Sequence, residues 1–244
     1  DQYLFNFQYL LNEFNYFRSD RRLNEIYEIF KGFFTEVSGD KFNLAGYSAG
    51  GQFVSRYMMC YPENLNLVAL GGAKSYLFPL LTYPYPFGLD CSNLNSFFDK
   101  PPEPHGVAQG APEWWANDLR KMDWNKKLNL LMDLNVFHLV GIDDRENEGH
   151  DREDIQDPLD DSRLWQGTNR WERAFNYHFE MRRAEYRQRK NGVRDQSKAF
   201  QMVFVPLMGN HEIAHSIFPN WLKACWEKFP AEILYAYDGY YRKR

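Results

Sequence analysis

The segment Lys41–Phe53 (KFNLAGYSAGGQF) constrains the fold of this chain more than any other stretch. Apolar residues at its start predict a short strand, and apolar residues at helical spacing after it predict a helix. Between the two, Gly46 and Gly50 flank Ser48 in a G-x-S-x-G pattern. We expect both glycine positions to require a small residue because the turn is tight, and we expect the turn to lift the serine oxygen above the edge of a sheet. The segment therefore predicts a strand, a cramped turn and a helix in immediate succession.

The same turn predicts a chemical role for its serine. The hydroxyl of Ser48 is expected to be accessible at the strand-to-helix junction, and the backbone N–H of Ala49 is placed to donate to a developing oxyanion. Such a serine is a poor nucleophile until a neighbouring base accepts its proton. Because a five-residue motif also occurs by chance, a glycine-rich turn with an ordinary serine remains the alternative. Partners for Ser48 elsewhere in the sequence therefore decide between the two interpretations.

Composition limits the classes of function open to the chain. With 244 residues, of which 44% are hydrophobic, the chain can bury one large core, and we expect a single domain over residues 1–244. A net charge of −4 argues against a nucleic-acid partner, and no run approaches the roughly 18 apolar residues of a membrane span. Cys60, Cys91 and Cys225 are odd in number and far apart, so neither a disulfide framework nor a thiolate metal site is indicated.

The compartment in which the protein works is left open by the sequence. The chain begins with Asp1, and no charged-then-apolar leader is visible. We favour the cytoplasm, although a lost signal peptide would fit the same residues.

Strands and helices are predicted to alternate along the chain. Apolar runs predict buried strands at residues 65–70, 134–140 and 200–205, and helical spacing predicts helices at 21–37, 171–190 and 214–228. Residues 2–17 fit a strand or a helix equally well. Alternation of this kind predicts the α/β class, with a mostly parallel sheet covered by helices on both faces.

One segment does not fit this alternation. Residues 75–124 are rich in proline and aromatic residues and have little periodicity, so we expect an irregular excursion that forms a lid or a pocket wall. Aromatic residues of this segment and of the serine turn are candidates to line an apolar acyl pocket, although packing is the simpler role for each. The candidates are Tyr47, Tyr83, Tyr85, Phe87, Trp114 and Trp115.

A candidate acid follows the strand at residues 134–140. That strand runs into Gly141-Ile142-Asp143-Asp144, which places two carboxylates just beyond its carboxyl end. Active sites of open parallel sheets lie at this edge. We favour Asp144 as the residue that orients the base, with Asp143 in reserve, and a helix cap or a solvated loop pair is the alternative.

A candidate base follows the next predicted strand in the same way. The strand at residues 200–205 leads into a loop that ends in His211, so the imidazole is expected at the same edge. The other histidines fit less well, because His138 lies inside a strand and His178 inside a helix. We therefore favour His211 as the base, with His215 as the second choice.

A second motif overlaps the candidate base. Residues His211–His215 (HEIAH) match H-E-x-x-H, in which two histidines one helical turn apart bind zinc and the glutamate acts as a base. The glycine and asparagine just before it suggest a loop or a helix start, whereas a zinc site needs both histidines inside a helix. Phe218 and Trp221 stand where the extended motif has glycine and histidine. A zinc metalloprotease remains an alternative, with His211, Glu212 and His215 as its residues.

With a serine turn, an acid and a base in that order, each after a strand, the chain resembles the α/β-hydrolase superfamily over most of residues 40–230. The segments Tyr83–Leu89 (YPYPFGL) and Gln166–Arg173 (QGTNRWER) resemble bacterial esterase-like hydrolases related to polyhydroxybutyrate depolymerases. The resemblance implies a serine hydrolase that needs no cofactor and acts on an ester or related acyl substrate, small or polymeric. The implied catalytic residues are Ser48 as nucleophile, Asp144 as acid and His211 as base.

The front of the chain departs from this family. The superfamily has several strands and an oxyanion loop, often His-Gly-Gly, ahead of the serine turn, and no such loop is visible before Ser48. We therefore expect a sheet that lacks its first strands and a second oxyanion donor that the sequence does not identify. A hydrolase-like scaffold that has lost activity and serves binding is the remaining alternative. The oligomeric state is open.

Overall fold

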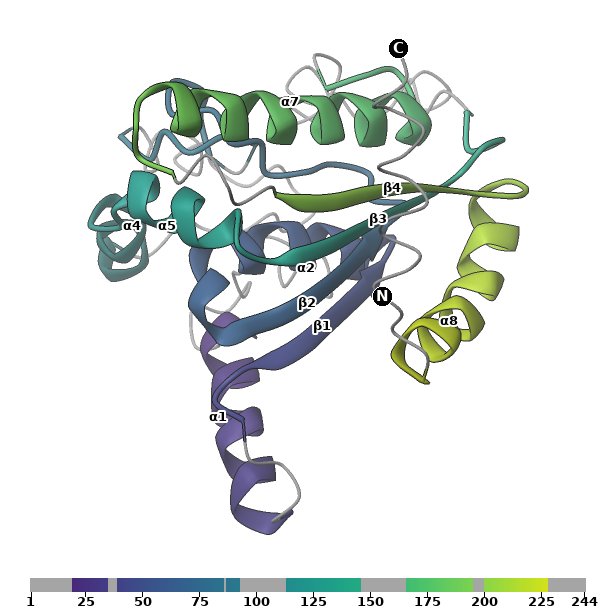
Figure 1. Cartoon of the computed structure of the whole chain (residues 1–244), viewed down its shortest axis with the longest axis horizontal. Coiled ribbons are helices and arrows are strands. Elements are labelled where there is room, and N and C mark those ends of the chain that lie inside the picture. The colour runs from purple at the N-terminus through teal and green to yellow at the C-terminus, as the bar shows by residue number, and fades with distance from the viewer. Residues whose placement is uncertain are drawn as a thin grey trace, which may run out of the picture.

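The computed structural model describes residues 19–34, 39–85, 87–92, 113–145, 166–194 and 200–227. Figure 1 shows the elements along the chain. In order they are α1 (Ser19–Phe33), β1 (Phe42–Tyr47), α2 (Ala49–Cys60), the short 3-10 helix η2 (Pro62–Asn64), β2 (Leu65–Gly71), α4 (Glu113–Arg120), α5 (Trp124–Leu131), β3 (Asn135–Gly141), α7 (Arg170–Lys190), β4 (Gln201–Leu207) and α8 (His211–Glu227).

The four strands form one parallel sheet in the order β1-β2-β3-β4 (Figure 1). Leu44 pairs with Val68, Val68 with Val136, and Val136 with Met202. Because neighbouring strands run in the same direction, their carboxyl ends lie at one edge of the sheet. The candidate serine and acid follow β1 and β3 directly, and the candidate base begins the helix that follows β4, so the three meet at this edge. The expected α/β class and parallel sheet are confirmed.

Helices cover both faces of the sheet, as the sequence predicts. Side chains alternate along a strand, so Val68 and Leu70 of β2 belong to one core cluster while Leu67 and Ala69 belong to another. The first cluster includes buried residues of α2, α5 and α7, and the second includes buried residues of α8. Figure 1 shows α7 and α8 on opposite sides of the strands. The carboxyl edge of the sheet thus lies between two helical layers.

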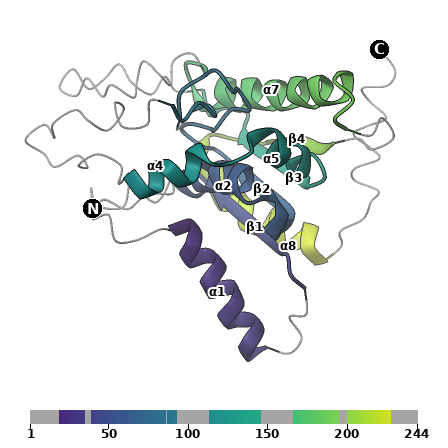
Figure 2. The same ribbon diagram turned by 90° about the vertical axis from the view of Figure 1, so that its left-hand side faces the viewer.

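Helix α1 confirms a sequence expectation about secondary structure but has an unexpected environment. Its apolar stripe is largely exposed, with Phe30 at 51% and Phe33 at 79% exposure, and Figure 2 shows α1 standing away from the sheet. Its contacts with the rest of the fold include Tyr27, whose ring lies 4.8 Å from that of Phe42 in β1, and Asp20, which accepts the hydroxyl of Tyr61 at 2.6 Å. No helix within the described ranges is long and apolar enough to cross a lipid bilayer.

The aromatic segment at residues 75–124 is only partly irregular. Residues 75–85 and 87–92 form bends and turns, joined by an isolated parallel bridge between Pro84 and Asp90. The end of the segment is helical, because α4 begins at Glu113, and this corrects the expectation of an irregular path up to residue 124. Residues 93–112 lie outside the described part of the chain. The irregular portion that remains follows β2 directly.

Candidate active site

Ser48 lies between β1 and α2 in a backbone conformation that few residues adopt. Its φ of 57° makes it the only non-glycine residue with positive φ in the described part of the chain. Such a conformation costs on the order of 1–3 kcal/mol and persists where surrounding contacts hold it. Here the N–H of Ser48 donates to the carbonyl of Gly71 at 2.9 Å, and its carbonyl accepts the N–H of Gln52 at 3.1 Å. The hydroxyl does not cap the helix that follows, so it is available to another partner.

The glycines around this turn differ from expectation in one respect. A Cβ on Gly46 would lie 2.4 Å from the carbonyl oxygen of Gly50, so Gly46 must be small, as expected. A Cβ on Gly50 would meet no described atom within 4 Å. A Cβ on Gly51 would instead lie 2.5 Å from the carbonyl oxygen of Gly71 in the neighbouring strand. The expectation for Gly50 is therefore wrong, and Gly51 is the residue that lets α2 pack closely on β2.

The acid loop follows β3 as expected and buries one of its two carboxylates. Asp144 is 3% exposed, and its N–H donates to the carbonyl of Gly141 at 3.1 Å. Asp143 is exposed, and its N–H donates to the carbonyl of Gly209 at 3.1 Å. This bond ties the loop after β3 to the loop after β4. Of the two aspartates, the structure turns Asp144 toward the edge of the sheet where Ser48 lies.

His211 is the first residue of α8 rather than a loop residue, which corrects the sequence prediction. The helix begins early because the Oδ1 atom of Asn210 accepts the N–H of Ile213 at 3.2 Å, which is the geometry of a helix cap. Gly209 precedes the cap with a φ of 93°, and a side chain there would meet Ile213. Gly209 and Asn210 left a loop or a helix start open in the sequence, and the cap formed by Asn210 decides for the helix start.

The three candidate side chains are in contact. The Nε2 atom of His211 lies 3.0 Å from Oγ of Ser48, and its Nδ1 atom lies 2.9 Å from Oδ2 of Asp144. The tautomer that fits both contacts carries its proton on Nδ1, where it donates to the carboxylate, and leaves Nε2 to accept the serine O–H. His211 is thereby joined by hydrogen bonds to Asp144, which lies 67 positions earlier in the sequence, and to Ser48, which lies 163 positions earlier.

Tyr47, a candidate pocket residue, lies against the imidazole instead of standing open to solvent. It is 7% exposed, and its ring centroid lies 5.3 Å from that of His211 and 5.4 Å from that of His215. Burial and then the negative charge of Asp144 raise the pKa of its hydroxyl, so Tyr47 stays neutral at physiological pH. The ring of Tyr47 therefore packs against the imidazole of the candidate base.

The geometry does not favour the H-E-x-x-H zinc site. Both ring nitrogens of His211 are engaged, one by Ser48 and one by Asp144. His215 is exposed one turn further along α8, with its ring against Tyr47. Within the ranges that the structure describes, no group of three or more His, Cys, Asp or Glu residues is arranged to hold a metal ion. A zinc ion at this position would have to break the contacts of His211.

The aromatic candidates of the excursion fall into different environments. Tyr85 and Phe87 are each 1% exposed, and Tyr85 belongs to the main core cluster, so its ring packs inside the fold. Tyr83 is partly exposed. Trp114 lies in the first turn of α4, and its side chain is outside what the structure describes. Their roles at a substrate pocket stay predictions.

One residue beside the site was missed by sequence reasoning. Arg170, the first residue of α7, places its Nη1 atom 3.5 Å from Oδ1 of Asp144. The sequence carried a signal only for the helix start, in Asn169, whose side chain accepts the N–H of Glu172 at 2.9 Å and so fixes where α7 begins. A helix start fixed there puts Arg170 at the carboxyl edge of the sheet.

Comparison with known proteins identifies the fold. No protein-family model matches the sequence, and no curated protein sequence matches it. Among solved structures, poly(aspartic acid) hydrolase-1 from Sphingomonas sp. KT-1 is similar with a TM-score of 0.59 and 17% identity, over 91% of this chain and 71% of that one. LpqC, a poly(3-hydroxybutyrate) depolymerase from Bordetella parapertussis, is similar with a TM-score of 0.54 and 18% identity, over 90% of this chain and 60% of that one.

The chain has the α/β-hydrolase fold. This confirms the fold that the order of serine, acid and base suggested, and the second structure is of the depolymerase type that the sequence resembles. At these identities the likeness concerns the fold, and the α/β-hydrolase architecture hosts many activities. The function therefore has to be argued from the residues at the carboxyl edge.

Proposed function

We propose that this protein is a serine hydrolase that cleaves an ester or related acyl bond through Ser48, His211 and Asp144. The observation that carries the proposal is the pair of contacts at 3.0 Å and 2.9 Å that link the serine hydroxyl to the imidazole and the imidazole to the carboxylate. A buried carboxylate, an imidazole within hydrogen-bonding distance of it and a partly exposed serine within reach of that imidazole are the parts from which nucleophilic acyl transfer is built.

The reaction begins with attack of the Ser48 oxygen on the acyl carbonyl. His211 accepts the serine proton at Nε2 and later gives it to the leaving alcohol, which departs as the acyl-enzyme forms. Water, deprotonated by the same imidazole, then releases the acid and restores the serine. Asp144 remains ionised and stabilises the imidazolium through Nδ1.

One oxyanion donor is available from the fold. Ala49 is the first residue of α2, and the first N–H groups of a helix have no partner within the helix. Its N–H, supported by the helix dipole, is proposed to stabilise the oxyanion of the tetrahedral intermediate. Loss of one donor typically lowers turnover by roughly 10²–10³, so a second donor that completes the site would raise activity on that scale.

The proposed acyl substrates include polymers. Two structurally similar proteins are named for acting on poly(aspartic acid) and poly(3-hydroxybutyrate). We therefore propose a panel that contains activated esters of short acids, oligomers of 3-hydroxybutyrate and oligomers of aspartic acid. Relative kcat/KM across the panel would rank the ester and amide classes.

The test compares hydrolysis of a p-nitrophenyl ester by the wild-type protein and by Ser48→Ala. We expect the substitution to lower kcat on the order of 10⁶-fold, because the nucleophile is removed while the fold is kept. Gln52→Ala is the control variant in the same assay, because Gln52 lies one turn further along α2 and is outside the three proposed residues.

The other two functions predict different outcomes. A metalloprotease would lose activity with a chelator and keep it in Ser48→Ala, whereas the proposed serine hydrolase is indifferent to the chelator. A binding scaffold would hydrolyse none of the panel in either form. Wild-type ester hydrolysis that survives Ser48→Ala would overturn the proposal.

A further inference from the structure

The carboxylate of Asp144 has a second partner besides the imidazole. Its Oδ2 atom faces His211, while its Oδ1 atom lies 3.5 Å from Nη1 of Arg170. The side chain of Asp144 is 4% exposed and that of Arg170 is 18% exposed. An ion pair screened from water to this extent is stronger than one on an open surface. The two oxygens of the acid are thus directed to two different residues.

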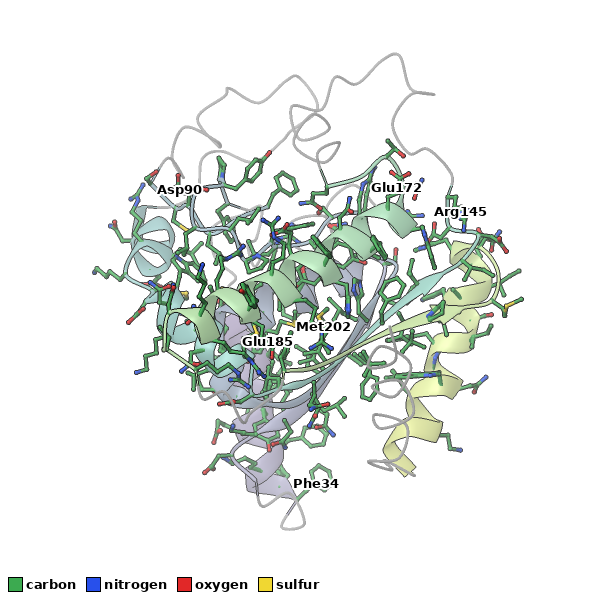
Figure 3. The ribbon with its side chains drawn as sticks, turned by 45° about the horizontal axis from the view of Figure 1, so that its top comes forward. Phe34, Asp90, Arg145, Glu172, Glu185 and Met202 are labelled. Atoms are coloured by element: carbon green, nitrogen blue, oxygen red, sulfur yellow. The ribbon has the colours of Figure 1, made fainter. Side chains whose placement is uncertain are left out.

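The main chain of Asp144 is held by the same helix. The N–H of Trp171 donates to the carbonyl of Asp144 at 3.1 Å. The next residue, Arg145, places its guanidinium 5.5 Å from the centre of the Trp171 ring. Figure 3 shows Arg145 and Glu172 at the same end of the molecule, where α7 begins and β3 ends. The first turn of α7 therefore contacts the acid through both backbone and side chain.

This first turn is itself fixed by several hydrogen bonds. Glu172 accepts the N–H of Thr168 at 2.8 Å and its hydroxyl at 2.7 Å, and these bonds lower the pKa of the Glu172 carboxyl. Arg173 is 1% exposed and donates to the carbonyls of Gly167 at 2.8 Å and Lys74 at 2.9 Å. Arg170 therefore projects from a pre-organised segment, and little freedom remains to be lost when it holds the acid.

We propose that Arg170 is a positioning residue for Asp144. By attracting Oδ1, the guanidinium fixes the rotation of the carboxylate about its side-chain bonds, so that Oδ2 stays directed at Nδ1 of His211. The imidazole is then held in the tautomer that accepts the Ser48 proton. Arg170 does not touch the substrate in this scheme, and its effect on catalysis passes through Asp144. The inference rests on the proposed function, in which these three residues act together.

A purely structural role for Arg170 predicts a different set of results. If Arg170 only anchored α7, its loss would lower the stability of the fold, and it would affect labelling to the same extent whether or not Asp144 were present. A positioning role predicts that the loss matters only while Asp144 is there to be positioned. The two roles are separated by a double-mutant cycle, in which non-additivity measures the coupling between the residues.

The experiment measures the rate at which a fluorophosphonate modifies the wild-type protein, Arg170→Ala, Asp144→Ala and the double variant. We expect Arg170→Ala to slow labelling roughly tenfold or more, as is typical when a hydrogen bond to a charged group is lost. In the Asp144→Ala background the same change should alter the rate by less than about twofold. Added guanidinium or ethylguanidinium should restore part of the rate to Arg170→Ala alone.

A matched control removes a neighbouring positive charge. Arg145 is exposed, follows Asp144 directly and donates from Nε to the carbonyl of Ile142 at 2.8 Å. Arg145→Ala should leave the labelling rate within about twofold of wild type, because a screened surface charge contributes little. Equal slowing in Arg145→Ala and Arg170→Ala would assign the effect to the general field and overturn the inference.

A second readout does not depend on turnover. The low-field proton resonance of the His211 Nδ1–H reports its hydrogen bond to Asp144, and Asp144→Ala identifies it by abolishing it. The inference predicts that Arg170→Ala broadens or shifts this resonance while Arg145→Ala leaves it unchanged. An unchanged resonance, or equal slowing by Arg170→Ala in both backgrounds, would overturn the inference. If the wild-type protein is not labelled at all, the proposed function fails, and the resonance still tests Arg170.

Discussion

Two histidines, one within β3 and one at the start of the helix that follows the neighbouring strand β4, have opposite environments. His211 follows β4 at the carboxyl edge, and both of its ring nitrogens have partners. His138 lies within β3 under α7, is 0% exposed, and neither of its ring nitrogens has a partner among the described residues. The comparison teaches that position along a parallel strand decides what an imidazole can do. The edge offers polar partners from several loops, whereas the middle of the strand offers only the core.

The surroundings of His138 are aromatic. The rings of Tyr76, Tyr177 and Phe204 meet it nearly edge-on at centroid distances of 5.0 to 5.6 Å. Burial, and then the charge of His178, lowers the pKa of His138 well below its usual value. Burial also lowers the pKa of His178 to about 4. These two histidines are therefore neutral in the folded protein and act as packing groups.

The largest expected effect, on kcat, comes from replacing one of the two histidines at a time. We expect His211→Ala to lower kcat for ester hydrolysis on the order of 10⁶-fold with little change in the melting temperature, because its ring is partly exposed and sits at the edge. His138→Leu should keep kcat within about threefold of wild type, since the change lies within the core. Steady-state kinetics of the two purified variants checks this, and equal losses in both would break the comparison.

The second prediction concerns how closely the backbone is packed at the edge. Gly51→Ala should destabilise the fold by roughly 2–4 kcal/mol, because its Cβ would lie 2.5 Å from the carbonyl oxygen of Gly71. Gly50→Ala should instead stabilise the fold by up to about 1 kcal/mol, as alanine does within a helix. Urea unfolding of the pair measures both signs. Similar losses would mean that Gly50 is sterically required after all.

The third prediction is a pH dependence that belongs to the interior histidines. The pKa of His138 is lowered in the folded state. Below about pH 6.5 the unfolded chain therefore binds a proton at this histidine, whereas the folded chain does not. The contribution of this histidine to the free energy of unfolding is therefore fully present above that pH. As the pH drops below it, the free energy of unfolding falls by about 1.4 kcal/mol per pH unit for one such proton. His178 adds to the loss between about pH 6.5 and pH 4.

His138→Leu should make this dependence shallower. The free energy of unfolding, measured in urea from pH 7 to pH 4.5, is expected to lose the contribution of one proton from its slope. Phe137→Leu, a core substitution in the same strand that removes no titratable group, is the control and should leave the slope as it is. A wild-type slope that His138→Leu does not change would show that the proton binds elsewhere.

The order of elements was predictable because the physics behind it is local. Apolar runs and turn residues within a few positions of each other predicted β1, β3 and β4, and the parallel sheet followed from their alternation with helices. The contact of Asp144 with His211 could be anticipated, since carboxyl ends of parallel strands share one edge. The choice of Asp144 over Asp143 followed only from its distance beyond Gly141, and burial now distinguishes the two.

The features that were missed depend on packing between distant segments. Arg170 meets Asp144 across 26 positions, and no local pattern reports such a contact. Gly51 is required because of a carbonyl in β2, which sequence spacing within the turn does not reveal. The exposed stripe of α1 has the same cause, because helical periodicity says which face is apolar and leaves open whether anything covers it.

The central claim is that Ser48, His211 and Asp144 form one catalytic unit, and covalent labelling tests it most directly. The protein is treated with a fluorophosphonate, digested, and the modified residue is located by mass spectrometry in wild type and in His211→Ala. The account predicts one adduct, on Ser48, that forms rapidly in the wild type and is nearly absent in the variant. An adduct on another residue, or labelling of Ser48 at the same rate without the imidazole, would contradict it.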